Sequence, residues 1–167
     1  MAESNHTVAQ VVDLVSYNRE TGVFTWTRSR RGPVRAGEAA GYTDPKGYVV
    51  IHLFGRNIRA HRLAWFVCHG KWPSLDLDHI NGKRSDNRIA NLREVGNAIN
   101  RENMRSPRAD NRSGFLGVSP APKGSTGYRA TIQLRGRQRH LGIFPTPEAA
   151  YAAYVSAKRE LHEGCTI

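Results

Sequence analysis

The chain of 167 residues is poor in cysteine, poor in acidic residues and without a long apolar run. Its two cysteines, Cys68 and Cys165, lie far apart and form no Cys-x-x-Cys ligand pair, so we expect no structural zinc. We interpret both as reduced thiols, with Cys68 in the core. The sequence has no run of eighteen apolar residues and no signal-type segment, which predicts a soluble, cytoplasmic protein that does not enter a membrane.

The charge of the chain is strongly one-sided. Lysine and arginine number 25 against 14 acidic residues, which gives a net charge of +11. Such a chain attracts polyanions, because each bound phosphate releases condensed counterions. Charge alone leaves two partners open, nucleic acid and an anionic membrane surface.

An Asp-His pair is followed at set distances by two asparagines. Eleven residues separate His79 from Asn91, and eight separate Asn91 from Asn100. The carboxylate of Asp78 and the side-chain carbonyl of Asn100 are oxygen ligands for a hard divalent cation. So few protein ligands leave positions for water and phosphate, which suits Mg2+, with Mn2+ as the alternative. Because neutral His79 can accept the proton of an attacking water, the pattern predicts a one-metal phosphodiesterase site.

Each of these residues alone also fits a polar hairpin turn with ordinary capping asparagines. We expect instead a short strand with Asp78 and His79, a loop, a return strand Leu92–Val95 and a helix from about residue 97 to 104 that carries Asn100. Adjacent strand residues point to opposite faces. Asp78 and His79 therefore converge only if the strand ends or bulges near the Asn-Gly pair that follows them. The amide of Asn91, just before the return strand, would bind loop backbone and hold the loop shut.

Together these residues resemble the HNH nuclease family in its His-Asn-Asn form, as found in phage and intron homing endonucleases. The segment Asn57–Trp65 resembles the segment that precedes the site in that family. The resemblance implies that Asp78 and Asn100 are metal ligands. In the same way, His79 would be the general base and Asn91 a structural brace. It also implies a ββα-metal fold, DNA as substrate, 5'-phosphate and 3'-hydroxyl products, and a bacterial or phage-infected host cell.

Other basic residues near this site are candidate contacts to DNA. His61, in the upstream block, has two roles open: a structural role, by capping or bonding the loop, and a phosphate contact. Residues 101–113 hold four arginines without apolar periodicity, so we expect this stretch to lie along a phosphate backbone. The candidate contacts in the loop and in this basic stretch are Lys83, Arg84, Arg88, Arg105, Arg108 and Arg112.

The residues before the site predict an extension of one helix and a β-hairpin. Thr7 is expected to cap a helix with valines from Val8 to Val15, and Val23–Trp26 has the aromatic and branched content of a strand. A further strand, Tyr48–Leu53, would turn back over Gly55–Asn57.

Three strands and one helix are expected after the basic stretch. The strands are residues 115–118, 128–135 and 138–144, with a hairpin turn over 135–137, and Thr146 caps a helix rich in alanine. In the middle strand, Tyr128, Ala130, Ile132 and Leu134 alternate with polar residues. The alternation predicts that the apolar face packs on the helix while the opposite face exposes Arg129, Thr131, Gln133 and Arg135.

This second unit resembles the ethylene-response-factor (APETALA-type) DNA-binding domain over about fifty residues. The match rests on Gly117-Val118, Tyr128–Ile132, His140–Phe144 and Glu148–Tyr154. The alternative is that the arginines only solvate an exposed sheet. Family contacts to DNA carry over to Thr131, Gln133, Gln138 and His140.

The sequence thus predicts an α+β protein: an N-terminal ββα-metal HNH nuclease with a hairpin and helix extension, and a C-terminal three-stranded antiparallel sheet packed on one helix. We expect a nuclease domain over 1–104, a basic linker over 105–113 and a DNA-binding domain over 114–167. The expected function is a monomeric, metal-dependent, site-specific endonuclease on double-stranded DNA, which nicks unless it dimerises or acts twice. Two alternatives stay open, a non-catalytic DNA-binding regulator on a degenerate nuclease scaffold and an RNA-binding protein.

Overall fold

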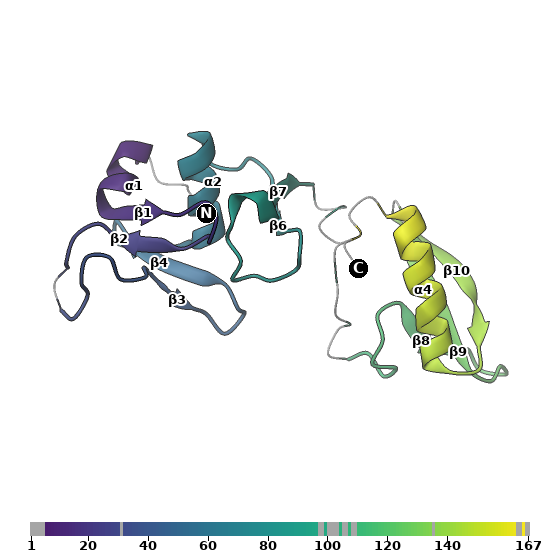
Figure 1. Cartoon of the computed structure of the whole chain (residues 1–167). Coiled ribbons are helices and arrows are strands. Elements are labelled where there is room, and N and C mark those ends of the chain that lie inside the picture. The colour runs from purple at the N-terminus through teal and green to yellow at the C-terminus, as the bar shows by residue number, and fades with distance from the viewer. Residues whose placement is uncertain are drawn as a thin grey trace. The chain divides into compact units, whose positions relative to one another are not determined.

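The computed structural model describes residues 6–30, 32–96, 99, 104, 107, 110–134, 136–162 and 165. They fall into two compact units, Met1–Val95 and Gly96–Ile167 (Figure 1). The boundary at residue 104 and the linker over 105–113 stay predictions. Among the described residues, no helix is long and apolar enough to cross a membrane.

The first unit consists of short helices and antiparallel strands. The strands form two pairs, β1–β2 and β6–β7, and a sheet in the order β3-β4-β5. In chain order its described elements are α1 (Val8–Leu14), β1 (Val15–Tyr17), β2 (Phe24–Trp26), β3 (Tyr42–Thr43), β4 (Val49–Leu53), β5 (Arg56–Arg59), α2 (Ala60–His69), β6 (Asp76–His79), the 3-10 helix η1 (Ile89–Asn91) and β7 (Leu92–Val95).

Helix α1 begins as expected and ends one residue early. The Thr7 hydroxyl accepts a hydrogen bond from the Gln10 backbone, and the Gln10 side chain accepts one from the Thr7 backbone, which is a capping box. The expectation that Val15 lies on this helix is wrong, because its extended backbone starts β1. Val11 is buried, whereas Val12 is exposed.

The turn between β4 and β5 is shorter than predicted. Leu53 pairs with Arg56, so the loop is the two residues Phe54 and Gly55, both with positive φ (52° and 73°). Such a turn follows the right-handed twist of the strands, and glycine at its second position lowers the strain. The predicted turn over Gly55–Asn57 is therefore wrong, because Arg56 and Asn57 belong to β5.

A single apolar cluster supports this unit. Helix α2 packs its buried face against the sheet and the first hairpin, and Gly70 ends the helix in the left-handed conformation (φ 73°). Cys68, expected in the core, is only partly buried. The buried members of the cluster are Val11, Val15, Phe24, Trp26, Ala40, Ile51, Leu53, Ala60, Leu63, Ala64, Phe66 and Leu92.

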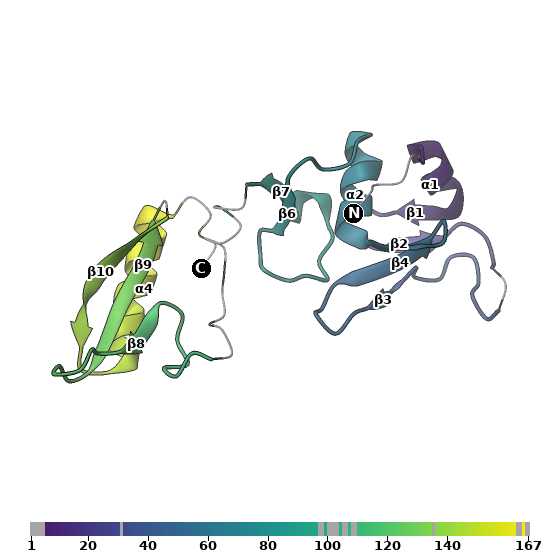
Figure 2. The ribbon, with the colours of Figure 1, turned by 180° about the vertical axis from the view of Figure 1, so that it is seen from behind.

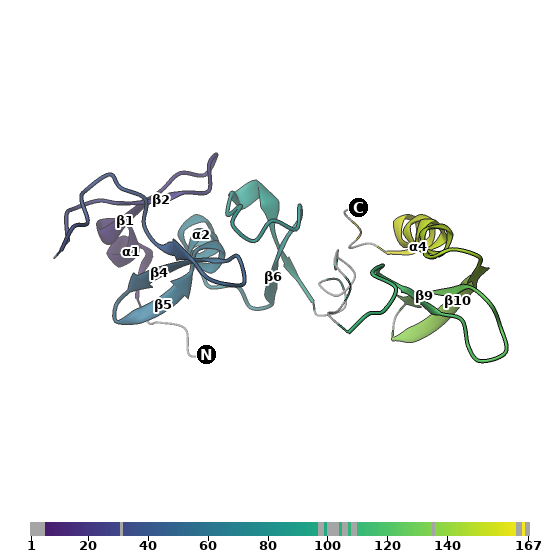
Figure 3. The same cartoon turned by 90° about the horizontal axis from the view of Figure 1, so that it is seen from below.

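The second unit is a three-stranded antiparallel sheet in the order β10-β9-β8 with one helix on it. Its described elements are β8 (Val118–Pro120), β9 (Tyr128–Leu134), β10 (Arg137–Phe144) and α4 (Pro147–Leu161). Helix α4 lies in front of the sheet in Figure 1 and behind it in Figure 2, and the view from below places it on one face of β9 and β10 (Figure 3). Thr146 caps this helix through the Ala149 amide, as predicted.

The alternation expected along β9 is present, because Ala130 and Ile132 are buried between the more exposed Arg129, Thr131 and Gln133. The first strand, by contrast, was predicted too early. β8 starts at Val118, because the side chains of Asn111 and Ser113 bond the carbonyl oxygens of Phe115 and Val118 and hold the preceding residues in a turn.

Asn111 and Ser113 therefore pack against the turn that follows them, whereas contact of this stretch with DNA stays a prediction. Lys158 on α4 was also missed: it is 1% exposed and donates a hydrogen bond to the Met104 carbonyl oxygen.

Candidate active site

The β6–β7 hairpin positions the two central residues of the site. Asp78 and His79 close β6 and are 8% and 5% exposed. The strand ends at His79, where the Gly82 amide donates to the His79 carbonyl oxygen (2.8 Å) and Gly82 adopts a φ of 72°. The strand therefore ends where the sequence required, and both side chains are withdrawn from solvent.

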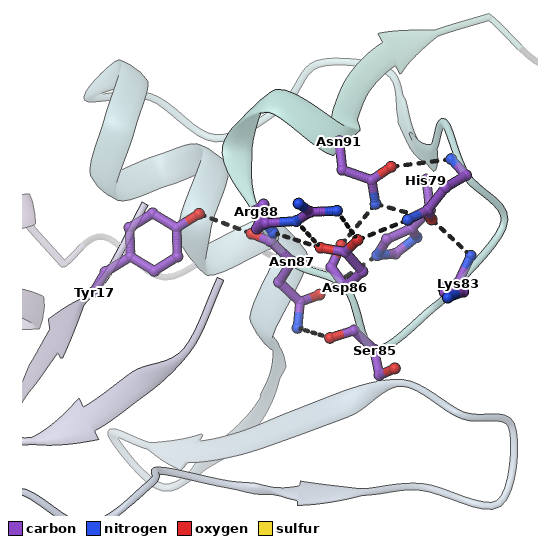
Figure 4. Close-up of polar contacts among 9 residues, drawn as sticks. Tyr17, His79, Lys83, Ser85, Asp86, Asn87, Arg88 and Asn91 are labelled. Carbon is purple, nitrogen blue, oxygen red and sulfur yellow. Dashed lines mark hydrogen bonds and ion pairs between the residues drawn. The ribbon is translucent and has the colours of Figure 1, made fainter. Parts of the chain in front are cut away.

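Asn91 ties the two ends of the loop together (Figure 4). Its Oδ1 accepts from the Asn81 backbone amide (3.0 Å). Its Nδ2 donates to Asn81 Oδ1 (3.1 Å) and to the Asp86 carbonyl oxygen (2.8 Å). The expectation that this amide binds loop backbone is confirmed. Because Asn91 is buried at the end of η1, directly before β7, the loop is anchored next to the strand that pairs with His79.

Asp86 and Arg88 form an ion pair inside the loop. Arg88 donates from Nε (2.8 Å) and Nη2 (2.6 Å), and Asn81 Nδ2 donates to the same carboxylate (2.6 Å). These hydrogen bonds lower the pKa of Asp86 to about 2, and those from Arg88 have the largest effect. The pairing leaves Arg88 with less net charge to offer a phosphate, and its contact to DNA stays a prediction.

Asn87 orients the imidazole of His79, a role that the sequence did not reveal. Its Oδ1 lies 3.4 Å from His79 Nε2, while its Nδ2 donates to the Ser85 carbonyl oxygen (3.1 Å). The second bond fixes which end of the amide faces the ring, so the oxygen accepts from Nε2–H. This favours the tautomer of His79 with its lone pair on Nδ1. Asn87 is 2% exposed, so it cannot move aside easily.

His61 lies edge-on against His79, with ring centroids 5.0 Å apart. It is 4% exposed, and burial, followed by His79 and two arginines, lowers the pKa of His61 to about 3. A neutral, buried ring favours a structural role over direct phosphate contact, although the ring packs against Tyr48 and His79 and its Nδ1 makes no hydrogen bond among the described residues. Burial also lowers the pKa of His79, against the opposing effects of Asn87 and Asp78. His79 is therefore neutral near pH 7, as a general base must be.

Asp78 faces Arg93 across the hairpin. Its Oδ2 accepts from Arg93 Nε (3.1 Å) and Nη2 (2.9 Å). This pairing compensates a nearly buried carboxylate, which would be costly without a partner. Arg93 was not predicted, although the register that sets it opposite Asp78 follows from the two strands.

The second predicted ligand, Asn100, lies outside the described residues. Among the residues that the structure describes, no group of three or more His, Cys, Asp or Glu side chains gathers as a metal site. A carboxylate and an amide oxygen nonetheless form a hard donor set that fits Mg2+.

The residues that are predicted to contact DNA lie in both units. Lys83 and Arg84 are exposed on the loop. In the second unit the register Gln138↔Gln133 and His140↔Thr131 brings four predicted readers to the outer face of the sheet. Gln138 Nε2 also donates to Thr131 Oγ1 (3.2 Å). Arg112 is exposed and Arg129 partly exposed, while Arg105, Arg108 and Arg135 lie outside the described residues.

Comparison with known proteins connects this geometry to a family. Residues 59–102 match the family model described as HNH endonuclease. The matched segment contains His61, Asp78, His79, Asn91 and Asn100. These residues lie in the segment that is similar to the HNH endonuclease model.

One relative supports the same family. DNA endonuclease I-HmuI of Bacillus phage SP01 is 36% identical over 94 residues, which are 53% of this chain and 51% of that protein. The chain thus spans about half the length of this curated relative. A solved structure titled "DNA binding and cleavage by the HNH homing endonuclease I-HmuI" covers 90% of this chain and 88% of that chain, at 18% identity and a TM-score of 0.40, which is a weak likeness. Both sequence matches are to proteins described as endonucleases.

Proposed function

We propose that this protein is a metal-dependent, homing-type DNA endonuclease with His79 as its general base. One observation carries the proposal: Asp78 and His79 are held, nearly buried, at the end of β6 by a loop that Asn91 closes. This arrangement lies within the segment that matches the HNH endonuclease model. The relative named a DNA endonuclease supports DNA as the substrate.

The residues of the chain divide the chemistry as follows. His79, with its lone pair on Nδ1, takes the proton of the attacking water, and Asn87 keeps the ring in that tautomer. Asp78 and Asn100 would hold a divalent cation such as Mg2+, which neutralises the charge that develops on the phosphate and the leaving oxygen. Arg93 orients the Asp78 carboxylate. The products would carry a 5'-phosphate and a 3'-hydroxyl.

The second unit is proposed to hold double-stranded DNA through the outer face of its sheet, in the manner of an ethylene-response-factor domain. The shared face of Thr131, Gln133, Gln138 and His140 supports this role. Such a face can enter a major groove, where glutamine pairs with adenine. As a monomer with one site, the protein would nick one strand in each event.

Supercoiled plasmid tests the proposed activity. We expect open-circular DNA in the presence of Mg2+, with Mn2+ as an alternative cofactor, and intact plasmid with EDTA. A protein that binds the plasmid but never cuts it with either cation would instead be a DNA-binding regulator. Competition between duplex DNA and RNA in the same binding assay would identify an RNA-binding protein.

A separate prediction concerns the outer face of the sheet in the second unit. Gln133→Ala should weaken binding to the preferred duplex by about 1–3 kcal/mol and leave binding to scrambled duplexes unchanged, if Gln133 reads a base. Arg112→Ala serves as the contrast, because the loss of a phosphate contact weakens all sequences alike and lowers the salt slope by about one. Titrations on a duplex selected from a random pool, at several salt concentrations, measure both effects. Equal losses on all duplexes for Gln133→Ala would contradict base reading.

A further inference from the structure

Two arginines share one aromatic ring beside the catalytic histidine. The guanidinium carbons of Arg59 and Arg84 lie over the Tyr48 ring, 4.3 and 5.1 Å from its centroid. The same ring lies 5.4 Å from the His61 ring and 6.1 Å from the His79 ring. We call Arg59, Tyr48 and Arg84 the Tyr48 cluster. It joins the end of β5 and the residue before β4 to the catalytic loop.

The Tyr48 cluster differs from other arginines of the unit in its charge balance. Arg28, Arg88 and Arg93 each pair with an aspartate. In the described part of the chain, no ion pair to a carboxylate is found for Arg59 or Arg84, and Arg84 Nη1 donates to the neutral carbonyl oxygen of Lys46 (2.9 Å). Both side chains are exposed.

Two like charges on one ring repel each other, and an anion bound between them or beside them removes that cost. A guanidinium is also planar and matches phosphate geometry with two parallel donors. Stacking on the Tyr48 ring holds each guanidinium in place before the ligand binds, so less conformational entropy is lost on binding. The site therefore suits a phosphodiester.

We propose that the Tyr48 cluster is a phosphodiester-binding site, which holds a backbone phosphate of the cut strand within reach of His79. The proposal rests on the proposed function. It assigns new DNA-positioning roles to Arg59 and Tyr48. For Arg84, already a candidate DNA contact, it specifies the phosphate, which belongs to the cut strand near His79. Arg59 and Arg84 bind the phosphate, and Tyr48 positions them. The simpler possibility is that both arginines only cover the tyrosine ring.

The chain offers a matched control. Arg30 also lies over an aromatic ring, that of Trp26 (4.5 Å), and donates to a backbone carbonyl oxygen, that of His52 (3.2 Å). Arg30→Ala removes the same kinds of contact as Arg84→Ala. No ring contact between Trp26 and His79 is found in the described residues, so Arg30→Ala should not affect a phosphate held near His79.

The test uses the full chain with His79→Ala, so that the DNA stays intact. In this background Arg59→Ala and Arg84→Ala should each weaken binding about tenfold and lower the slope of log Kd against log salt by about one. Arg30→Ala should change neither. A neutral methylphosphonate is then placed at each phosphate of the duplex in turn. At one position near the cut it should weaken binding by the parent protein and have little effect on binding by Arg84→Ala.

Several outcomes would overturn the proposal. One is that Arg59→Ala and Arg84→Ala change DNA affinity and its salt dependence no more than Arg30→Ala does. The other is that the methylphosphonate weakens binding equally in all variants at every position. Thermal unfolding of each variant verifies that it is folded. An inactive protein with Mg2+ would overturn the proposed function, but the binding data would still decide the phosphate site, because they do not depend on cleavage.

A different observation concerns the first hairpin, β1–β2, which lies outside the segment that matches the family model. Tyr17 on β1 donates from its hydroxyl to the Asn87 carbonyl oxygen (2.8 Å), as Figure 4 shows. A Cβ added to Gly22 would lie 2.4 Å from the Arg88 nitrogen and 2.6 Å from the Asn87 carbonyl carbon. The hairpin therefore rests directly on the backbone of the residue that orients His79.

We propose that the β1–β2 hairpin positions Asn87, and through it the catalytic base. Gly22 and Gly55 provide a matched pair, because both have a φ of 73°, but a Cβ on Gly55 would meet nothing within 4 Å. Alanine at either position carries the same backbone strain, and only at Gly22 would it push the loop away.

Gly22→Ala should lower kcat about tenfold with KM for DNA unchanged, while Gly55→Ala keeps kcat at the wild-type value. Tyr17→Phe keeps the ring, loses the hydrogen bond and should lower kcat by a smaller factor. Steady-state cleavage at several DNA concentrations, below the unfolding temperature of every variant, measures kcat and KM. Equal kcat values for Gly22→Ala and Gly55→Ala would show that the hairpin supports only stability.

Discussion

Replacing His79 by alanine should lower the cleavage rate by about two to four decades, because no other described group takes its place as proton acceptor. The His61 ring lies 5.0 Å from the His79 ring, but burial lowers the pKa of His61 to about 3, so it is a weak base and is not expected to substitute. DNA affinity should change little, since His79 is 5% exposed and offers hardly any surface to the duplex. Single-turnover cleavage of labelled duplex with Mg2+ measures the rate, and binding without cation measures the affinity.

His52→Ala is the control for this prediction. His52 is an exposed histidine on β4 whose Nδ1 lies 3.0 Å from Asn57 Oδ1. Its loss should leave the cleavage rate within about twofold. Cleavage by His79→Ala within tenfold of the wild-type rate would reject the assignment of His79 as the base. Asn87→Ala should give an intermediate loss, because the imidazole remains but its tautomer is no longer fixed.

The sequence predicted the order of the site because that order depends on local signals. The return strand is Leu92–Val95, as expected, and the Asn-Gly pair after His79 ends β6. Glycine readily adopts positive φ, and an asparagine amide bonds nearby backbone. Both preferences are local, so a short stretch of sequence is enough to predict them.

The residues that tune the site were missed because they depend on distant contacts. Arg93 meets Asp78 only through the register of two strands, and Tyr17 meets Asn87 across seventy positions of the chain. Nothing in a single sequence reports such pairings, whereas alternation along one strand does. The start of β8 was misplaced for a related reason. The branched and aromatic residues there favour a strand, but the side chains of Asn111 and Ser113 compete for their carbonyl oxygens.

Substitution of Asp78 by asparagine should abolish Mg2+-dependent cleavage. Asp78 would supply the charge of the proposed ligand pair, and a metal contributes several kcal/mol to the stabilisation of the transition state, so the rate should fall by about two decades or more. Asparagine keeps the size and one oxygen of the side chain. The change therefore tests the charge with little effect on packing.

Asp78 also pairs with Arg93, so a loss of activity has two explanations. Arg93→Gln separates them, because it breaks the same ion pair and leaves the carboxylate in place. If Asp78 is a ligand, Arg93→Gln should retain cleavage that saturates with Mg2+, whereas Asp78→Asn should stay inactive at every Mg2+ concentration. Thermal unfolding should report a similar loss of stability in both variants, since each breaks the same ion pair. Mg2+ titrations that superimpose for wild type and Asp78→Asn would transfer the ligand role to another carboxylate, for which Asp76 on the same strand and Asp86 in the loop are the nearest in sequence.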